Sequence, residues 1–333
     1  MWPATTNHSH TTRPFILLVD DDAELGHVIS SILEHDGFHV MQAHNVAHAI
    51  KAFRQHKPNL VIVDMRLPDG RGSDLIAYIR QHEEGKAIPI LVVSALVDTQ
   101  SIQAARKAGA DEYLTKPFPP SDLLSIVRNN LKRRQAVERL ATREAHLQTV
   151  TMLANTIEAR DHYTRGHVGR VKAMALRLAK HLGWSEEALT ILEFGALLHD
   201  IGKIAIPESI LNKPAPLTKT EAAIMRSHPQ QGAEMLKQVA HLQPAIPYVL
   251  YHHERWDGSG YPFGLRGHEI PIEGRLLAIA DVFDAMITHR PYKPALPKAA
   301  AVEEIRRNAG VLFDPDITAA FLELVAAGEI GKD

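Results

Sequence analysis

The sequence FILLVD, residues 15–20, decides the fold of the first part of this chain. It is a run of large apolar residues closed by an acid, and comparable runs follow: HVMQA at 39–43, LVIVD at 60–64, PILVVSA at 89–95 and EYLTKP at 112–117. Runs of this kind are typical of strands buried on both faces of a parallel sheet. Because stretches with a helical pattern separate them, we predict a doubly wound α/β domain of five βα units over residues 14–130.

Polar side chains stand where these strands end. Asp20 and Asp21 follow the first strand and Asp64 ends the third. Ser94 closes the fourth strand and Lys116 follows the fifth. The carboxyl ends of parallel strands meet at one edge of the sheet, where ligands gather. Clustered carboxylates repel one another unless a cation is present, oxygen ligands suit Mg²⁺, and a lysine supplies a positive charge for a phosphoryl oxygen.

The order DD…D…S…KP resembles that of the receiver domain of two-component response regulators. The resemblance implies that Asp64 accepts a phosphoryl group from a sensor histidine kinase. It implies that three acids hold Mg²⁺, namely Asp20, Asp21 and Asp64. It also implies three residues that respond to the phosphate: Ser94, Tyr113 as the aromatic switch, and Lys116, whose peptide bond to Pro117 would be cis.

A long helix is predicted between the two halves of the chain. Residues 119–160 contain no glycine and, after Pro120, no proline. Apolar or small side chains recur there at helical spacing: Val137, Leu140, Leu147, Thr151 and Ala154. This stripe either pairs with a second copy in a homodimeric coiled coil or lies on the following domain. We assign residues 131–150 to a helical linker, and residues 1–13, which lack the apolar core of a signal peptide, to a disordered tail.

After about residue 150 the pattern becomes all-helical, up to about residue 330. Ser185 precedes Glu186 and Glu187, and Thr218 has Glu221 at the capping-box position, so both are expected to start helices. The chain is therefore expected to be multidomain, with an all-α domain following the α/β domain and the linker helix.

Histidines and acids in this second half have the composition of a metal site. The run HHERWDGSGYP, residues 252–262, begins with adjacent histidines, which cannot share one face of a helix, and its Gly258 and Gly260 are expected to form turns with positive φ. Asp281 lies in the otherwise apolar helix LLAIADVFDAMI, where an unpaired carboxylate would be costly. The chain has 20 His and no Cys, so any metal must be held by nitrogen and oxygen. The candidate ligands are His167, His199, Asp200, His228 (expected to end a helix before Pro229), His252, His253 and Asp281.

The segments HDIGK (199–203) and HHERWDGSGYP resemble those of the HD-GYP family of metal-dependent phosphohydrolases, over residues 150–330. Members hydrolyse cyclic di-GMP to pGpG, in some cases onward to GMP, by metal-hydroxide attack at a binuclear centre. The resemblance makes the seven residues metal ligands, with Asp200 bridging the two ions. It implies Fe or Mn, with Zn, Ni or Co as alternatives. It also implies four substrate contacts: Lys203 on the scissile phosphate, Tyr261 against a guanine, and Arg290 and Lys293 on the other phosphate.

One position departs from the family pattern. Members that hold three metals carry a Glu where this chain has Tyr163, so we predict a binuclear centre, with Glu158 or His162 as the only candidates for holding a third ion. Asp284 is expected to be structural, like Asp22 and Asp69, which are expected to be caps or solvated charges. Four further histidines are expected to lie in the core or on the surface: His181, His241, His268 and His289.

Composition excludes several classes of protein. The net charge of −2 disfavours a general DNA or membrane binder, and the longest nearly apolar run, residues 87–97, is too short to cross a bilayer. Composition thus favours a cytoplasmic protein, and the two resemblances imply a phosphodiesterase specific for cyclic di-GMP and controlled by phosphorylation. One alternative is a weakly active cyclic-dinucleotide sensor that acts through partners such as diguanylate cyclase (GGDEF) domains contacting the GYP loop. Another is an HD phosphohydrolase for a different substrate, such as a hybrid cyclic dinucleotide.

Overall fold

The computed structural model describes residues 13–95, 99–161, 166–289 and 294–331. The chain divides into two compact units, Met1–Arg143 and Glu144–Asp333, which are called here the first and second units. Residues 1–12 of the predicted tail lie outside the described residues.

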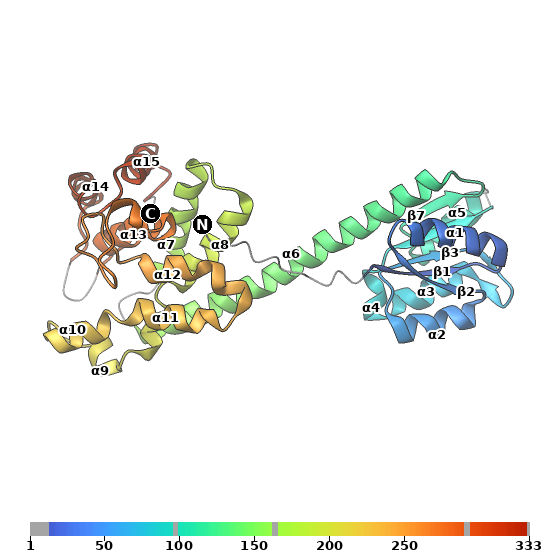
Figure 1. Cartoon of the computed structure of the whole chain (residues 1–333), viewed down its shortest axis with the longest axis horizontal. Helices are drawn as coiled ribbons and strands as arrows, with labels where there is room; N and C mark the ends of the chain where they lie inside the picture. Colours follow the sequence, from blue (N-terminus) through green and yellow to red (C-terminus); the bar gives the residue numbers. More distant parts are fainter. Residues whose placement is uncertain (1–12, 96–98, 162–165, 290–293, 332–333) are drawn as a thin grey trace. The chain divides into compact units, whose positions relative to one another are not determined.

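The first unit is an open α/β sheet (Figure 1). Its five main strands are all parallel and lie in the order β2-β1-β3-β6-β7. These strands are β1 (Phe15–Val19), β2 (His39–Ala43), β3 (Leu60–Val63), β6 (Ile90–Ser94) and β7 (Glu112–Thr115). The helices between them are α1 (Ala23–His35), α2 (Val46–His56), α3 (Gly72–Gln81), α4 (Glu83–Lys86) and α5 (Thr99–Ala108). The predicted doubly wound fold is confirmed.

Each face of the sheet has its own core. Leu17 and Val19 of β1 pack with residues of α2, α3 and α5. Ile16 and Leu18, which point to the other face, pack with residues of α1 and of α6 (Pro120–Arg160). Strands buried on both faces explain why these runs are continuously apolar.

Two acids of the first unit cap helices, as expected. Asp22 is the N-cap of α1 and accepts hydrogen bonds from the backbone N–H groups of Glu24 and Leu25. Asp69 accepts hydrogen bonds from the N–H groups of Val46 and Ala47 in the first turn of α2. Asp69 lies in a small hairpin that the sequence pattern did not predict, formed by β4 (Arg66–Leu67) and β5 (Gly70–Arg71).

Helix α6 is the predicted long helix. Its N-terminal part buries Leu123 and Val127 in the core of the first unit. In the second unit, Leu147 and Ala154 pack against that unit's own helices. Val137 and Leu140 are 60% and 63% exposed. The predicted stripe is therefore divided: its later part lies on the following domain, whereas its earlier part has an exposed apolar surface.

The second unit is all-helical, as predicted. Its α-helices are α7 (His167–His181), α8 (Glu186–Leu198), α9 (Glu208–Leu211), α10 (Lys219–Met225), α11 (His228–Lys237), α12 (Ile246–Tyr251), α13 (Ile272–Ile287), α14 (Lys298–Arg307) and α15 (Pro315–Ala326). Three 3₁₀ turns join them, η1 (Ile201–Ala205), η2 (Ala240–Ala245) and η3 (Gly267–Glu269). The main core packs α7, α8, α13, α14 and α15 together. None of the described helices is both long and apolar enough to span a bilayer.

Helix starts follow the predicted capping signals, with one exception. Ser185 caps α8 and Thr218 forms a complete capping box with Glu221. His228, however, was expected to end a helix and instead begins α11. The reason is Pro229, which lacks an N–H and is tolerated in the first turn of a helix, where that donor has no intrahelical partner.

Candidate metal centre and phosphoacceptor site

The first unit gathers its acids at the carboxyl edge of the sheet, around a lysine. Lys116 Nζ lies 2.7 Å from Asp20 Oδ2 and 2.6 Å from Asp64 Oδ2. Burial alone would lower the Lys116 pKa, but hydrogen bonds and charge from the two carboxylates outweigh it and raise that pKa. Lys116 therefore serves as the counter-charge for both acids in this structure.

The other predicted residues at this edge of the sheet differ in how far they are buried. Asp21 is exposed, Ser94 is buried at the end of β6, and Tyr113 is half-buried in β7. The Lys116–Pro117 peptide bond is cis, as expected. The three acids do not form a group with ligand atoms within 4.8 Å of one another, whereas two such groups exist among the described residues of the second unit.

The second unit brings all seven predicted ligands together, although they come from six elements or their edges. His167 begins α7, His199 caps the end of α8, Asp200 precedes η1, His228 begins α11, His252 caps the end of α12 with His253 next to it, and Asp281 lies within α13. Gly202 makes the approach of η1 to α11 possible, because a Cβ there would lie 1.9 Å from the carbonyl oxygen of His228.

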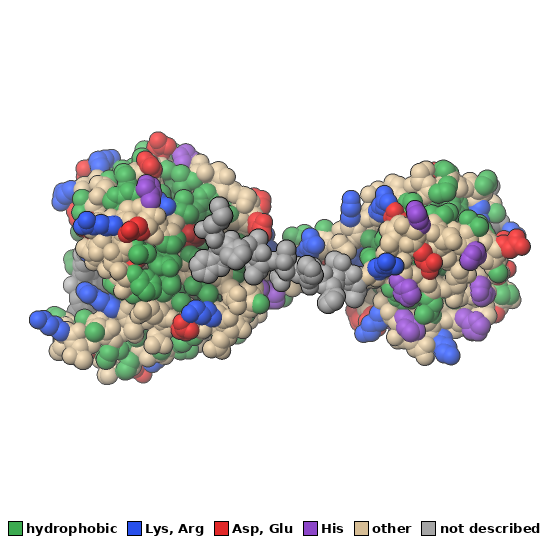
Figure 2. Space-filling model, in the orientation of Figure 1, with side chains coloured by type: hydrophobic (Ala, Val, Ile, Leu, Met, Phe, Trp, Pro, Cys, Tyr) green, Lys and Arg blue, Asp and Glu red, His purple; other side chains and the backbone are tan. Residues whose placement is uncertain are grey.

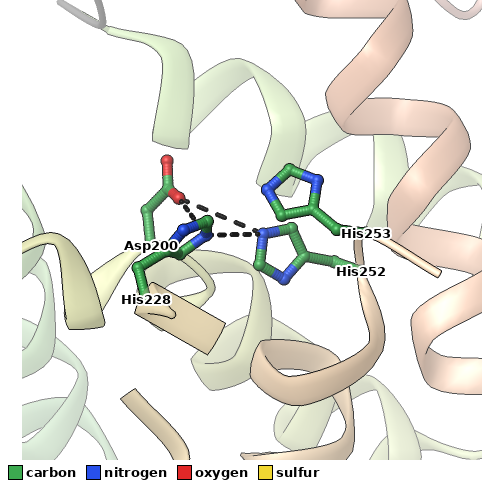
Figure 3. Close-up of side chains that lie close together, drawn as sticks. All are labelled: Asp200, His228, His252 and His253. Atoms are coloured by element: carbon green, nitrogen blue, oxygen red, sulfur yellow. Dashed lines mark hydrogen bonds and ion pairs between the residues drawn. The ribbon is translucent and has the colours of Figure 1, made fainter. Parts of the chain in front are cut away.

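The ligands form two groups that meet at Asp200. One group is Asp200, His228, His252 and His253; the other is His167, His199 and Asp281. Asp200 Oδ1 lies 3.3 Å from His228 Nε2 and 4.0 Å from His252 Nε2. Dashed lines in Figure 3 mark these two contacts. The other Asp200 oxygen, Oδ2, lies 3.5 Å from His199 Nε2. Asp200 thus presents one oxygen to each group.

Four of the imidazoles are anchored through the same ring nitrogen. Nδ1 lies 2.8 Å from the Ala196 carbonyl in His199, 2.9 Å from the Met225 carbonyl in His228 and 2.8 Å from the Val249 carbonyl in His252. In His167, Nδ1 lies 2.7 Å from Asp284 Oδ2. An Nδ1–H that donates to such an acceptor leaves the Nε2 lone pair for a metal. The buried Nε2 of His199 has no hydrogen-bond partner among the described residues, as expected of a ligand atom.

The pKa shifts in this cluster favour groups that bind cations. Burial first, and then neighbouring histidines, lower the pKa of His252 well below its ordinary value, and burial lowers the pKa of His253 to about 3. Both imidazoles are therefore neutral. His167 differs, because hydrogen bonds to Asp281 and Asp284 outweigh the effect of burial and raise its pKa to about 9. Its proton compensates the charge of two buried carboxylates, which is what a bound cation would do.

Lys203 lies beside Asp200 and is held by an acid that the sequence analysis missed. Its Nζ lies 2.8 Å from Asp200 Oδ2 and 2.9 Å from Asp161 Oδ2. Asp161 is 5% exposed and directly follows α6. The neighbouring Arg160 donates hydrogen bonds to the carbonyls of Ile204 and Ile206, so the end of α6 is fastened to η1 and to the residue that follows it. An acid at the end of a long polar helix was the available sequence signal.

Asp284 supports the cluster by contacting His167 on the ring nitrogen opposite the one that contacts the candidate ligand Asp281. It is 1% exposed, contacts His167 Nδ1, and accepts a hydrogen bond from Arg170 Nε at 2.7 Å. The expectation that Asp284 is structural agrees with this arrangement. It lies three residues after Asp281 on α13, and residues at this spacing are neighbours on a helix surface. The two acids can therefore contact opposite nitrogens of the same imidazole, that of His167.

The loop after His253 holds Tyr261 over the cluster. The rings of His253 and Tyr261 stack with their centroids 4.7 Å apart, and the backbone N–H of Tyr261 donates a hydrogen bond to the His253 carbonyl. Positive φ was expected at both Gly258 and Gly260, but only Gly258 has it, at 81°. Gly260 is required for a different reason: a Cβ there would lie 2.3 Å from the backbone nitrogen of Arg255.

Several predicted residues lie outside the described part of the chain or outside the cluster. Arg290 and Lys293 belong to the first kind, as do His162 and Tyr163. Glu158 accepts hydrogen bonds from the N–H groups of Gly166 and Val168, so its carboxylate is used at the start of α7. The four histidines expected to lie in the core or on the surface, His181, His241, His268 and His289, belong to neither ligand group.

Histidines of the first unit also remain apart. Figure 2 shows several of them, in purple, on the visible face of that unit. Among the described residues, none of them belongs to a group with the geometry to hold a metal ion. Within the described ranges, the high histidine count therefore has a metal-binding explanation only in the second unit.

Comparison with known proteins agrees with this division. The family model of the response regulator receiver domain matches residues 16–128, and that of the HD domain matches residues 151–317. The chain is 36% identical to the cyclic di-GMP phosphodiesterase response regulator RpfG of Xanthomonas campestris, over 92% of this chain and 86% of that protein. It is 35% identical to a cyclic di-GMP phosphodiesterase of Thermotoga maritima, over 93% and 90%.

A third relative matches about half of the chain. It is the 3′3′-cGAMP-specific phosphodiesterase 2 of Vibrio cholerae, 43% identical over 54% of this chain and 35% of that protein. Since both family models and two relatives of nearly full length match, the chain belongs to the family of response regulators that join a receiver domain to a C-terminal HD domain.

Proposed function

We propose that this chain is a response regulator that hydrolyses cyclic di-GMP to pGpG at a binuclear metal centre. The observation that carries the proposal is the position of Asp200, which offers one carboxylate oxygen to each of two ligand groups. The full-length relatives named as cyclic di-GMP phosphodiesterases support the choice of substrate.

The donor atoms suit a pair of transition-metal ions. Imidazole and carboxylate ligands favour Fe, Mn or Zn over softer or harder ions, and we propose Fe or Mn. Two bound ions would supply an activated water and neutralise charge during in-line displacement at phosphorus. The anchored imidazoles would keep that site rigid.

Lys203 would act on the substrate rather than on the metals. Its pKa is raised, because the charges of Asp200 and Asp161 outweigh its burial, and the ammonium group therefore stays protonated. Placed 2.8 Å from the bridging acid, it can donate to a non-bridging oxygen of the scissile phosphate as negative charge develops there. Asp161 is a positioning residue, because it fixes the ammonium group.

We further propose that phosphorylation of Asp64 by a histidine kinase, with Mg²⁺ bound at Asp20, Asp21 and Asp64, regulates the second unit. A phosphoryl group on Asp64 would compete for Lys116 and so change the pairing at the sheet edge. Helix α6 is continuous from the core of the first unit to the hydrogen bonds of Arg160 with η1. We propose that a change in this helix acts on Lys203 through Asp161, which follows the helix and pairs with the lysine.

Partners and location follow from the same proposal. Exposed Val137 and Leu140 give α6 an apolar surface on which a second copy would pack. Diguanylate cyclase domains are proposed to contact the loop of residues 252–262, and the protein is proposed to act in the cytoplasm. A hybrid cyclic dinucleotide is a second candidate substrate, which the 43% identity to a 3′3′-cGAMP-specific enzyme favours.

One experiment separates these functions. Protein purified anaerobically and loaded with Mn²⁺ is incubated with cyclic di-GMP or 3′3′-cGAMP, and the products are followed by chromatography. We expect pGpG from cyclic di-GMP with many turnovers per chain. Stoichiometric binding without product would instead identify a sensor, and turnover of 3′3′-cGAMP alone would identify the hybrid dinucleotide as the substrate.

A further inference from the structure

Arg226 is a cation beside the metal cluster that the mechanism above does not use. It caps the end of α10, lies two residues before His228, and is exposed. Among the residues that the structure describes, no carboxylate forms an ion pair with it. Its guanidinium carbon lies 5.4 Å from the centroid of the Tyr261 ring. An arginine that is placed over an aromatic ring but lacks an acidic partner is available to an incoming ligand.

Tyr261 connects this arginine to the cluster. Its ring stacks on His253, a member of one ligand group, with an interplanar angle of 28°. The Tyr261 ring therefore contacts both the imidazole of His253 and the guanidinium of Arg226.

The chemistry of the guanidinium narrows what it can bind. Its N–H groups radiate in one plane, and this fork matches two acceptors side by side, as in a phosphate or in the O6 and N7 atoms of guanine. The scissile phosphate is already served by the ligand groups and by Lys203. Arg226 is linked to the cluster through the Tyr261 ring and His253 rather than through Lys203, so a base is a better candidate for its ligand than the scissile phosphate.

We propose that Arg226, held over Tyr261, determines base specificity by donating a pair of hydrogen bonds to O6 and N7 of a guanine of the substrate. The proposal rests on the proposed function and refines it, because it concerns which cyclic dinucleotide is bound. Adenine carries an amino donor where guanine has O6, so it cannot accept both bonds. Relatives named for cyclic di-GMP and for 3′3′-cGAMP show that base choice differs within this group of proteins.

The test compares three variants of the full chain on two substrates. Arg226→Ala removes the fork, Arg226→Lys keeps the charge without the fork, and Arg307→Ala removes an exposed arginine of α14 as a matched control. Both kcat/KM and the Kd from calorimetry are measured with cyclic di-GMP and with cyclic di-AMP. We expect Arg226→Ala to lose cyclic di-GMP affinity by roughly 5- to 150-fold, the range for one bidentate contact to a base, and Arg226→Lys, which can still donate to O6 and N7, to lose less. We expect a much smaller loss with cyclic di-AMP and no change in Arg307→Ala.

Two outcomes would overturn the assignment. Equal losses on both substrates would show a contact with phosphate charge alone. Unchanged affinity in Arg226→Ala would show that the guanidinium binds no part of the ligand. Failure of the proposed function would give a different result, because wild-type protein would cleave bis(p-nitrophenyl) phosphate but no cyclic dinucleotide. The comparison of Kd values would still test Arg226 in that case.

Discussion

The two acidic sites of this molecule use a lysine in the same way but differ in everything around it. In the receiver domain, Lys116 lies between Asp20 and Asp64; in the HD domain, Lys203 lies between Asp161 and Asp200. All four Nζ–O distances fall between 2.6 and 2.9 Å. In both sites the paired carboxylates keep the lysine charged despite burial.

The difference lies in the other ligands. The receiver site has only carboxylates, one of them, Asp21, exposed, and its acids are not gathered into a compact group. The HD site adds five imidazoles, four of them anchored at Nδ1. Oxygen ligands on an open edge suit Mg²⁺, which keeps several waters, whereas a preformed nitrogen-rich cage suits ions that remain bound. The two sites therefore differ in the kind of cation that their side chains suit.

The largest effect is expected where both ligand groups depend on one residue. Asp200→Ala removes the shared carboxylate, so we expect turnover of cyclic di-GMP to fall by at least about 10³-fold, the upper range for loss of one stabilising group. Elemental analysis should show fewer than two transition-metal ions per chain. If the variant kept two ions and normal turnover, Asp200 would not be the shared ligand, and the HD site would not differ from the receiver site in this way.

A smaller loss of metal affinity is expected from a change at Asp284, which contacts the candidate ligand His167. Asp284→Asn leaves the shape of the side chain but removes the charge that orients His167 through Nδ1. Changes to such supporting residues cost roughly 10- to 100-fold in metal affinity or activity. The metal affinity is measured by titrating metal into protein from which a chelator has removed the bound ions. Arg307→Ala serves as the control. An unchanged metal affinity would mean that the cage does not depend on its outer contacts.

The shared lysine arrangement is tested at Asp161. Asp161→Asn should lower kcat by about 10-fold. Lys203 then keeps only one charged partner, so its ammonium group is held less firmly and stabilises the charge developing on the scissile phosphate less well. KM and metal content should change little, and Asp161→Glu should restore part of kcat. A loss of metal or a pure KM effect would assign Asp161 to folding or binding instead.

The smallest effect on basal hydrolysis is expected in the receiver site. Asp64→Ala removes the proposed phosphoryl acceptor, but neither candidate ligand group contains a described residue of that domain. Basal turnover should stay measurable, while any response to acetyl phosphate, a small phosphoryl donor, should disappear. Total loss of turnover, equal to that of Asp200→Ala, would show that the two sites are not independent.

The fold was predicted well where it depends on local sequence signals. The apolar runs indicated the five strands, and the side chains of Ser185 and Thr218 indicated two helix starts. His228 was misplaced because a proline marks a helix start as readily as a helix end. The role of Gly260 was missed because it depends on a close backbone approach that only the folded loop creates.

The candidate site was predicted to the extent that its residues are rare types in unusual surroundings. Adjacent His252 and His253, and Asp281 within an apolar helix, are costly unless they bind something. The only local signal for Asp161 was its position at the end of a long polar helix, and Arg226 has ordinary neighbours in the sequence. Their importance comes from contacts with Lys203 and Tyr261, which are 42 and 35 positions away and meet them only in the fold.

The most direct test of the account is the position of the metals themselves. Crystals of the protein grown with Mn²⁺ should show two anomalous scattering peaks, one in each ligand group, with Asp200 between them. We predict a separation of roughly 3.5–4 Å, as in two-metal hydrolytic sites. A single peak, or two peaks that do not share Asp200, would contradict the binuclear centre.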